Sequence, residues 1–247
     1  MHRLPFIAIA LTAASLPVAA CSMSWGDEAS DTTGVAAQGT GGTRHYAVRD
    51  FDTVSLAAAG DVDVRVGGDW SVTATGTPAA LDKLVVERDG DTLKLRRRSG
   101  MSWSSGDKVR FAVTMPRIEG ANIGGSGSIT VDRVPGGKFE GNIGGSGRLD
   151  IGGMAVDSAE FSIGGSGTVI AAGRARSLEV NIGGSGNVQL TPLRTETADI
   201  TIAGAGKVDA TATSHAEVTI LGSGNVTVGG GAKCSTTKLG AGSVRCG

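Results

Sequence analysis

Five carboxylates recur at an almost constant spacing in the second half of the chain. They stand seven residues before the last glycine of a repeated Gly-Ser-Gly motif, at Glu140, Glu160, Glu179, Asp199 and Glu217. A pair of such groups can act as acid and base on a glycosidic bond, whereas a longer row can attract a cation or a basic partner. A row of charges can also keep the surface of a sheet solvated and discourage pairing with other chains.

The sequence offers little for nucleophilic or metal chemistry. A serine nucleophile needs a nearby base and a group that orients this base, and of the three histidines only His215 lies among the repeats. Calcium-binding glycine-rich repeats carry Asp two residues after the last glycine, where this chain has apolar residues such as Ile129 and Leu149. We therefore expect no catalytic serine, no metal ion and no cofactor.

The acidic residues belong to a glycine-punctuated repeat. The motif Asn-Ile-Gly-Gly-Ser-Gly, or a variant of it, ends in successive copies at Gly127, Gly147, Gly167, Gly186, Gly206, Gly224 and Gly242. The spacings between these glycines are 20, 20, 19, 20, 18 and 18 residues. A period in this range is typical of solenoids, in which each repeat forms one coil of the stack.

Apolar and polar residues alternate on both sides of each glycine. Ile182 stands four residues before Gly186, and Val188 and Leu190 stand two and four residues after it. This alternation predicts β-strands with one buried face, and the constant period predicts that equivalent residues stack from coil to coil. Asn181 and its equivalents should then form an outward polar column. We expect glycine at the corners because a tight bend needs backbone angles that glycine adopts at low cost.

Three features together resemble the GIN-domain family, described as the head domain of auto-transporter adhesins. They are the segment FDTVSLAAAGDVDVRV that begins at Phe51, the segment VTMP that ends at Pro116, and the series of Gly-Ser-Gly motifs. The resemblance implies a right-handed, parallel β-helix-like fold at the cell envelope, and it brings no catalytic residues with it. The expected fold is therefore an all-β solenoid with rungs of about 18–20 residues.

The sequence predicts one folded domain over residues 46–247. Residues 46–116 are less regular and should form the first section and cap of the solenoid, with a short helix that begins after Thr77 and a hairpin through Asp89-Gly90. Residues 117–247 should form the regular rungs.

The first 45 residues are typical of an export signal followed by a tether. Residues 1–20 combine a short apolar stretch with the small residues Val18-Ala19-Ala20 before Cys21, which is similar to a bacterial lipoprotein signal. We expect cleavage before Cys21 and lipid attachment to its thiol. Ser22 is typical of lipoproteins that are sorted to an outer membrane, on its periplasmic or its surface side. Residues 21–45 are small and polar and should form a flexible tether.

Two further cysteines fall in the last repeat. Aligned on Gly242, Cys246 takes the place of Val228, and Cys234 takes the place of Leu178. Both side chains should therefore point inward from the two arms of the last corner. An exported protein meets oxidising conditions, so we expect a Cys234–Cys246 disulfide.

Composition and charge narrow the function classes. The formal net charge is −1, which gives no electrostatic reason to expect a nucleic acid as partner. We expect a non-catalytic, lipid-anchored envelope protein, adhesin-like or structural, that contacts an envelope polymer, a glycan or a protein. Its candidate contact surface comprises the acidic residues together with Met101 and Trp103, which lie in a serine-rich loop. The alternative is a polysaccharide-active lyase or hydrolase on the same scaffold.

Overall fold

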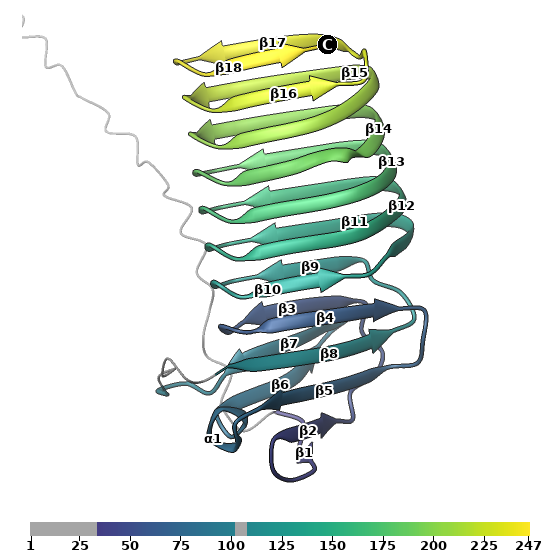
Figure 1. Cartoon of the computed structure of the whole chain (residues 1–247), viewed down its shortest axis with the longest axis vertical. Helices are drawn as coiled ribbons and strands as arrows, with labels where there is room; N and C mark the ends of the chain where they lie inside the picture. Colours follow the sequence, from purple (N-terminus) through teal and green to yellow (C-terminus); the bar gives the residue numbers. More distant parts are fainter. Residues whose placement is uncertain (1–33, 102–107) are drawn as a thin grey trace, which may run out of the picture. The chain divides into compact units, whose positions relative to one another are not determined.

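The computed structural model describes residues 34–101 and 108–247. Over these residues the chain winds into a right-handed parallel β-solenoid (Figure 1). All 18 strands of the described part belong to one continuous sheet, and its one helix, α1 (Pro78–Leu81), is a single turn. The expected fold class is thus confirmed. Trp103 and the expected signal sequence, including Cys21, lie outside the described residues.

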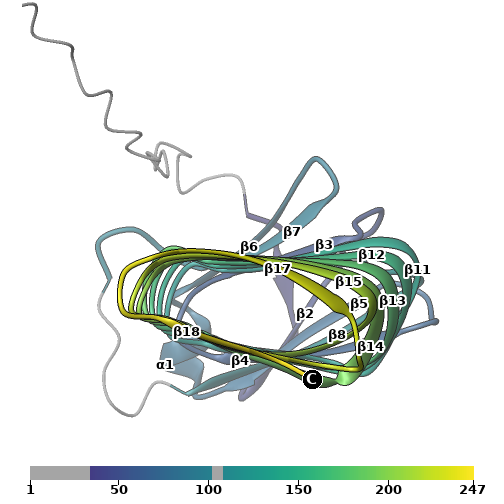
Figure 2. The ribbon, with the colours of Figure 1, turned by 90° about the horizontal axis from the view of Figure 1, so that it is seen from above.

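Each regular rung has two nearly straight sides, which are the long sides of the flattened ring in Figure 2. A tight glycine corner joins the sides at one edge, and a wide turn joins them at the other. The regular rungs comprise β9 (Gly120–Ile123), β10 (Ser128–Val131), β11 (Val134–Ile143), β12 (Arg148–Ile163), β13 (Thr168–Ile182), β14 (Asn187–Gly204), β15 (Lys207–Gly222), β16 (Asn225–Gly229), β17 (Lys233–Leu239) and β18 (Ser243–Cys246).

Neighbouring rungs pair in parallel, in the register that the sequence columns predict. On the side after the corner, Leu149 lies opposite Ile129. On the side before the corner, Ile182 lies opposite Ile163 and Ile202. None of these five side chains is more than 2% exposed. The core is therefore a stack of aliphatic layers between the two sides, and the residues between these positions face outward.

The tight corner requires glycine because the backbones of successive rungs approach closely there. At Gly145, Gly165 and Gly184, an added Cβ would lie less than 3.0 Å from the carbonyl oxygen of the equivalent glycine one rung earlier. Hydrogen bonds join the corners, as from the amide of Ser166 to the carbonyl of Gly145 at 3.0 Å. Our expectation that backbone angles explain these glycines applies only to later corners such as Gly204, where φ is +146°.

The wide turn at the other edge absorbs the differences in repeat length. The pairing of β12 with β13 shifts its register between Ile151 and Met154, and the pairing of β14 with β15 shifts between Leu190 and Arg194. The straight sides keep their register on either side of these shifts. Insertions at the wide turn therefore leave the columns on the straight sides unchanged.

The first section is built around one rung, which pairs with the regular rungs on one side and with further strands of the first section on the other. This rung consists of β3 (Thr53–Ala57) and β4 (Asp61–Val66), which pair with β9 and β10 on one side. On the other side they pair with β7 (Thr92–Arg97) and β8 (Val109–Met115).

Antiparallel strands then end the stack. They are β2 (Thr43–Tyr46), β5 (Ser71–Gly76) and β6 (Leu84–Asp89), which pair with β5, β8 and β7 respectively. Strand pairing already begins at β1 (Ala37–Gln38), inside the range that we expected to be tether. The reason is that β2 adds to the edge of β5 and buries Tyr46.

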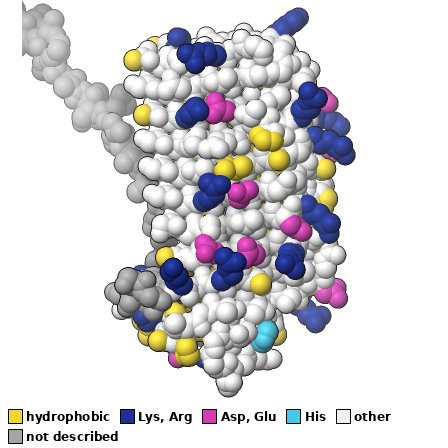
Figure 3. Space-filling model, viewed as in Figure 1, with side chains coloured by type: hydrophobic (Ala, Val, Ile, Leu, Met, Phe, Trp, Pro, Cys, Tyr) yellow, Lys and Arg dark blue, Asp and Glu magenta, His cyan; other side chains and the backbone are white. Residues whose placement is uncertain are grey.

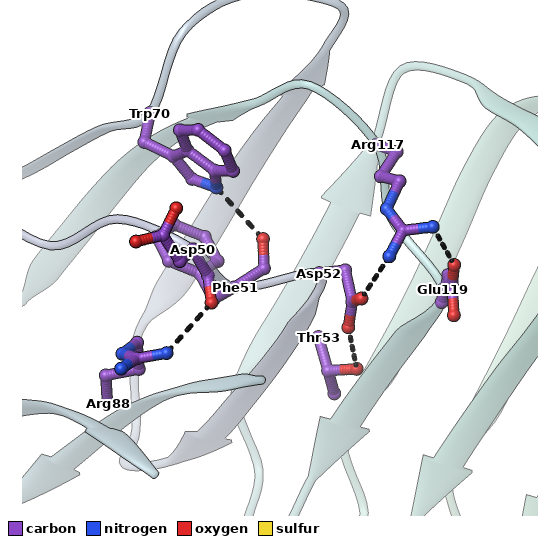
Figure 4. A network of polar contacts seen from close by, with 8 residues as sticks. All are labelled: Asp50, Phe51, Asp52, Thr53, Trp70, Arg88, Arg117 and Glu119. Atoms are coloured by element: carbon purple, nitrogen blue, oxygen red, sulfur yellow. Dashed lines mark hydrogen bonds and ion pairs between the residues drawn. The ribbon is translucent and has the colours of Figure 1, made fainter. Parts of the chain in front are cut away.

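A polar network fixes the entry of the chain into the first rung (Figure 4). Arg88 donates a hydrogen bond to the carbonyl oxygen of Asp50 at 3.1 Å. Asp50 has φ of +58°, a left-handed conformation that Asp tolerates better than most residues. Arg117 bridges Asp52 at 2.9 Å and Glu119 at 2.6 Å, which ties the start of β3 to the start of β9.

The last rung is closed by a disulfide between Cys234 of β17 and Cys246 of β18, whose Cα atoms lie 6.5 Å apart. It joins the two sides of the rung across the end of the core. Cys234 is half-buried and Cys246 is exposed because no further rung covers them. In the same rung Lys238 lies opposite the buried Ile220, and this charge discourages the addition of another rung.

Two identical substitutions in β13 test the inward and outward assignments. Ile182→Asp should lower the free energy of unfolding by about 4 kcal/mol or more, because it buries an unpaired charge in the core. Ile170→Asp, on the outward side of the same strand, should cost roughly 1 kcal/mol or less. Chemical denaturation of the purified variants measures both values. Similar losses at the two positions would contradict the assignment.

Candidate functional site

The side of the rungs that precedes the glycine corners carries all five expected carboxylates in one straight column. Parallel pairing places each acid opposite the next, in the order Glu140, Glu160, Glu179, Asp199 and Glu217. Neighbouring strands are about 4.8 Å apart, so the carboxylates form an evenly spaced row. We call this side the acidic face; it consists of β9, the C-terminal parts of β11 to β15, and β17.

A second outward column runs beside the acidic one, two residues further along each strand. Its members are Asn122, Asn142, Ser162, Asn181, Thr201, Thr219 and Thr237. The amide of Asn142 donates to the side-chain oxygen of Asn122 at 2.9 Å, and the amide of Asn181 donates to Glu179 at 2.9 Å. The polar column is thus partly a ladder of its own and partly a donor to the carboxylates.

A cation balances only the N-terminal end of the acidic column. Lys138 forms ion pairs with Glu140 and, at 3.5 Å, with Glu160. The hydrogen bond to Glu140 and the charge of this residue raise the pKa of the Lys138 amino group. Within the described part of the chain, no basic side chain comes within 4.0 Å of the carboxylates of Glu179, Asp199 or Glu217.

Asp199 lies at the centre of the unbalanced part of the column. Partial burial raises the pKa of its carboxyl group, and the charges of Glu217 and Glu179 raise this pKa further. The ionised form of Asp199 therefore lowers the stability of the folded state. A cation placed against these three groups would remove part of this destabilisation.

A small hollow lies at the N-terminal end of the acidic face. Gly120 occupies the position in the column between Thr53 and Glu140 and lines a space of about 240 Å³. Lys138 and Asn142 also line this space. An added Cβ at Gly120 would lie 2.9 Å from the Thr53 hydroxyl oxygen, so a larger residue at this position would force the Thr53 side chain to shift.

The opposite straight side, which we call the paired face, has a different charge arrangement. Arg148 pairs with Asp150 at 3.2 Å, and Lys207 pairs with Asp209 at 2.7 Å. Figure 3 shows basic and acidic side chains next to each other on this side. Since these charges neutralise one another locally, the uncompensated acidic charge is a property of the acidic face.

The sequence interpretation missed a groove at the wide turn. It has a volume of about 380 Å³ and is lined by residues of four consecutive strands, Val156, Asp157, Arg174, Ala175, Arg176, Arg194, Thr195, Glu196 and Thr213. Arg174 and Arg194 lie opposite each other in β13 and β14. Both stand twelve residues before the last glycine of their repeat, so alignment of the repeats could have found this pair.

The other predicted site residues fall outside the acidic face or outside the described residues. Met101 follows β7 and is 39% exposed, while its expected partner Trp103 and the lipidation site Cys21 are not described. In the part of the chain that is described, no group of three or more His, Cys, Asp or Glu side chains is placed to hold a metal ion. No helix of this part has the length and apolar character needed to cross a bilayer.

Replacing Asp199 tests the strain in the acidic column. Asp199→Asn should raise the free energy of unfolding at pH 7 by roughly 0.2–1 kcal/mol, the scale of like-charge pairs across strands. Because the folded-state pKa is raised, the cost of Asp199 is fully present above this pKa. The cost disappears as the pH falls through this pKa toward the ordinary Asp value, so the gain from the substitution should disappear over the same range.

Denaturation curves of the variant between pH 3 and pH 7 check this expectation. Asp209→Asn is the matched control, because Asp209 lies in an ion pair with Lys207, and its loss should give no stabilisation. A lower stability of Asp199→Asn than of the parent at pH 7 would contradict the electrostatic account.

Comparisons with solved structures support the fold. A structure described as a "putative adhesin" from Bacteroides fragilis NCTC 9343 has a TM-score of 0.79 and 21% identity, over 83% of this chain and 95% of that chain. One described as a "putative lipid binding protein" from Parabacteroides distasonis ATCC 8503 has a TM-score of 0.66 and 22% identity, over 85% and 98%. At this identity the likeness shows the fold alone.

A second comparison concerns sequence families. No curated protein matches the chain. A family model does match, over residues 50–232, which include the first section and most of the regular rungs. The chain therefore belongs to the family described as "Putative auto-transporter adhesin, head GIN domain".

Proposed function

We propose that this protein is a non-catalytic, adhesin-like protein of the cell envelope that holds a basic partner against its acidic face. The observation that carries the proposal is the row of Glu179, Asp199 and Glu217, which lie in register without a cation in the described structure. The partner is a protein or polymer that presents amino or guanidinium groups. Membership of a family described by an adhesin head domain supports a role in binding.

The regular spacing of the carboxylates suits a partner that makes the same contact several times. A single exposed ion pair contributes only about 0.2–1 kcal/mol. Neighbouring contacts on one rigid face strengthen each other, because the first contact raises the local concentration of the next group. The straight side fixes the row before binding, so little conformational entropy is lost on the side of this protein.

The arrangement of the carboxylates favours binding over catalysis. An acid and a base that cleave a glycosidic bond must lie on the two sides of that bond. Neighbouring members of the acidic column point outward from the same side of the sheet, so they would lie on one side of a bound chain. This geometry supports a contact surface and disfavours the polysaccharide-active enzyme that we considered as the alternative.

We also propose that the protein is attached to the outer membrane through a lipid on Cys21. The lipoprotein-like residues Val18-Ala19-Ala20-Cys21 and the following Ser22 support this attachment. The stretch between Cys21 and the first strand at Ala37 would then hold the solenoid near the membrane surface. Such anchoring would present many copies of the acidic face to one partner.

Binding to immobilised basic polymers tests the acidic face. The full mature protein should bind poly-lysine or chitosan, and added salt should weaken this binding. The variant Glu179→Gln/Asp199→Asn/Glu217→Gln should bind at least about tenfold more weakly, because it lacks the uncompensated charges. Surface plasmon resonance at several salt concentrations measures both effects.

The matched control removes the same number of carboxylates from the paired face. Asp63→Asn/Asp150→Asn/Asp209→Asn changes the net charge equally and should alter the affinity less than about twofold. Equal losses for both triple variants would reject the acidic face as the contact surface. Release of shorter chitosan chains that depends on Glu179, Asp199 and Glu217 would identify an enzyme instead.

The lipid anchor is tested by cell fractionation. Cys21→Ser should move the protein from the membrane fraction to the soluble fraction, because it removes the thiol that would carry the lipid. The control Cys234→Ser/Cys246→Ser removes the two cysteines of the disulfide and should leave the protein in the membrane fraction. Membrane retention of Cys21→Ser at the level of the parent would refute the anchor.

A further inference from the structure

The wide turn of the solenoid holds two arginines that lack an acidic partner of the kind that Arg148 and Arg176 have. Arg174 and Arg194 are exposed and lie directly opposite each other on adjacent strands. Among residues 34–101 and 108–247, no carboxylate oxygen lies within 4.0 Å of either guanidinium group. Like charges in directly opposite positions of a sheet destabilise the pair. The fold therefore places two positive charges next to each other, and their contacts show no interaction that would stabilise the fold in return.

The neighbouring column of the same groove is balanced by contrast. Arg176 stands between Asp157 and Glu196 in the order of the strands, and it forms an ion pair with Asp157 at 3.5 Å. The groove thus has one neutralised wall, which contains Arg176, and one cationic wall, which consists of Arg174 and Arg194. The positive charge that remains available to a ligand comes from the cationic wall.

The segments between these two walls are buried and held by hydrogen bonds. Ala175 is buried, and Thr195 is only 2% exposed. The Thr195 hydroxyl donates to the carbonyl of Thr211 at 2.8 Å, and the Thr213 hydroxyl donates to the carbonyl of Thr195 at 3.1 Å. These bonds satisfy backbone groups where the register of β14 and β15 shifts. The two arginines are therefore presented from a fixed backbone, which favours a defined binding geometry.

We propose that this groove binds an oxyanion group of an acidic polysaccharide, with Arg174 and Arg194 as the two cationic contacts. Guanidinium groups match carboxylate, sulfate and phosphate oxygens through paired N–H donors. The volume of about 380 Å³ lies in the range of small-molecule sites and accommodates a sugar unit, whose hydroxyls can donate to Glu196. The groove is open at the edge of the stack, so the rest of a polymer can extend along it.

This site is independent of the acidic face and of the function proposed for it. The two surfaces select opposite charges and lie on different parts of the rung, one on a straight side and one at the wide turn. Variants of the groove leave the carboxylates of Glu179, Asp199 and Glu217 unchanged. Failure of one proposal therefore leaves the other testable.

Binding of acidic polysaccharides by the full mature protein tests the groove. Polygalacturonate and dextran sulfate are the probes, and neutral dextran is the uncharged control. The variant Arg174→Gln/Arg194→Gln should bind the probes at least about tenfold more weakly and with a shallower dependence on salt. Arg148→Gln/Arg245→Gln, which removes two arginines from the paired face, should stay within about twofold of the parent.

Two further readouts separate binding from a structural role. Arg174→Lys/Arg194→Lys keeps the charges but loses the planar donors, so its affinity should lie between those of the parent and the glutamine variant. Without ligand, the glutamine variant should melt at the same temperature as the parent or higher, because it removes a repulsion. A lower melting temperature would show that the arginines serve the fold and would overturn the proposal.

The probes also distinguish the sources of the anion. Tighter binding of polygalacturonate than of dextran sulfate assigns the site to carboxylated sugars, and the reverse order assigns it to sulfated ones. The proposal is overturned if the glutamine variant binds both polymers like the parent, or if neutral dextran binds equally well. It is also overturned if only anionic lipid vesicles, and neither polymer, depend on Arg174 and Arg194.

Discussion

The close approach of backbones at the glycine corner determines the rest of this structure. At Gly145 and its equivalents, the chain passes so near to the preceding rung that a Cβ has no room. Hydrogen bonds from corner to corner, such as the bond from the amide of Ser185 to the carbonyl of Gly165 at 2.9 Å, hold this approach. Because one edge of every rung is fixed in this way, the strands that leave the corner on both sides start in a common register.

Because the rungs share one register, a residue type that recurs with the period of the sequence forms a continuous column in the structure. Each inward residue meets its equivalent in the core, as Ile182 meets Ile163 and Ile202, and each outward residue meets its equivalent in solvent. A single acidic residue in the repeat therefore becomes a row of carboxylates, whether or not the row favours folding. Desolvation, and then the charges of Glu217 and Glu179, raise the pKa of the Asp199 carboxyl group. A gain in stability at Asp199 therefore does not explain the row, and we attribute the row to binding.

The columns of the straight sides could be predicted from the sequence because they depend only on distance from the glycine corner. This reasoning placed the acidic column, the core columns and the Cys234–Cys246 pair. The Arg174–Arg194 pair also keeps a constant distance from the glycine corner and could have been aligned. The groove around this pair could not be predicted, because register shifts at the wide turn decide how its other lining residues lie. The same reasoning also placed the start of the domain too late, since β1 pairs with its neighbour β2, and β2 depends on pairing with β5 rather than on the repeat.

The two surfaces differ in how a partner can use them. On the acidic face, neighbouring carboxylates are closer to each other than the screening length of about 8 Å at physiological ionic strength. Salt therefore screens them only partly, and Glu179, Asp199 and Glu217 attract a basic partner together. In the groove, the two guanidinium groups act on one anionic group within a shaped space, so orientation matters as much as charge. A solenoid can carry both kinds of contact because the straight sides repeat strictly while the wide turns vary. Variation at the wide turns therefore offers selectivity for a ligand without disturbing the repeated face or the core beneath it.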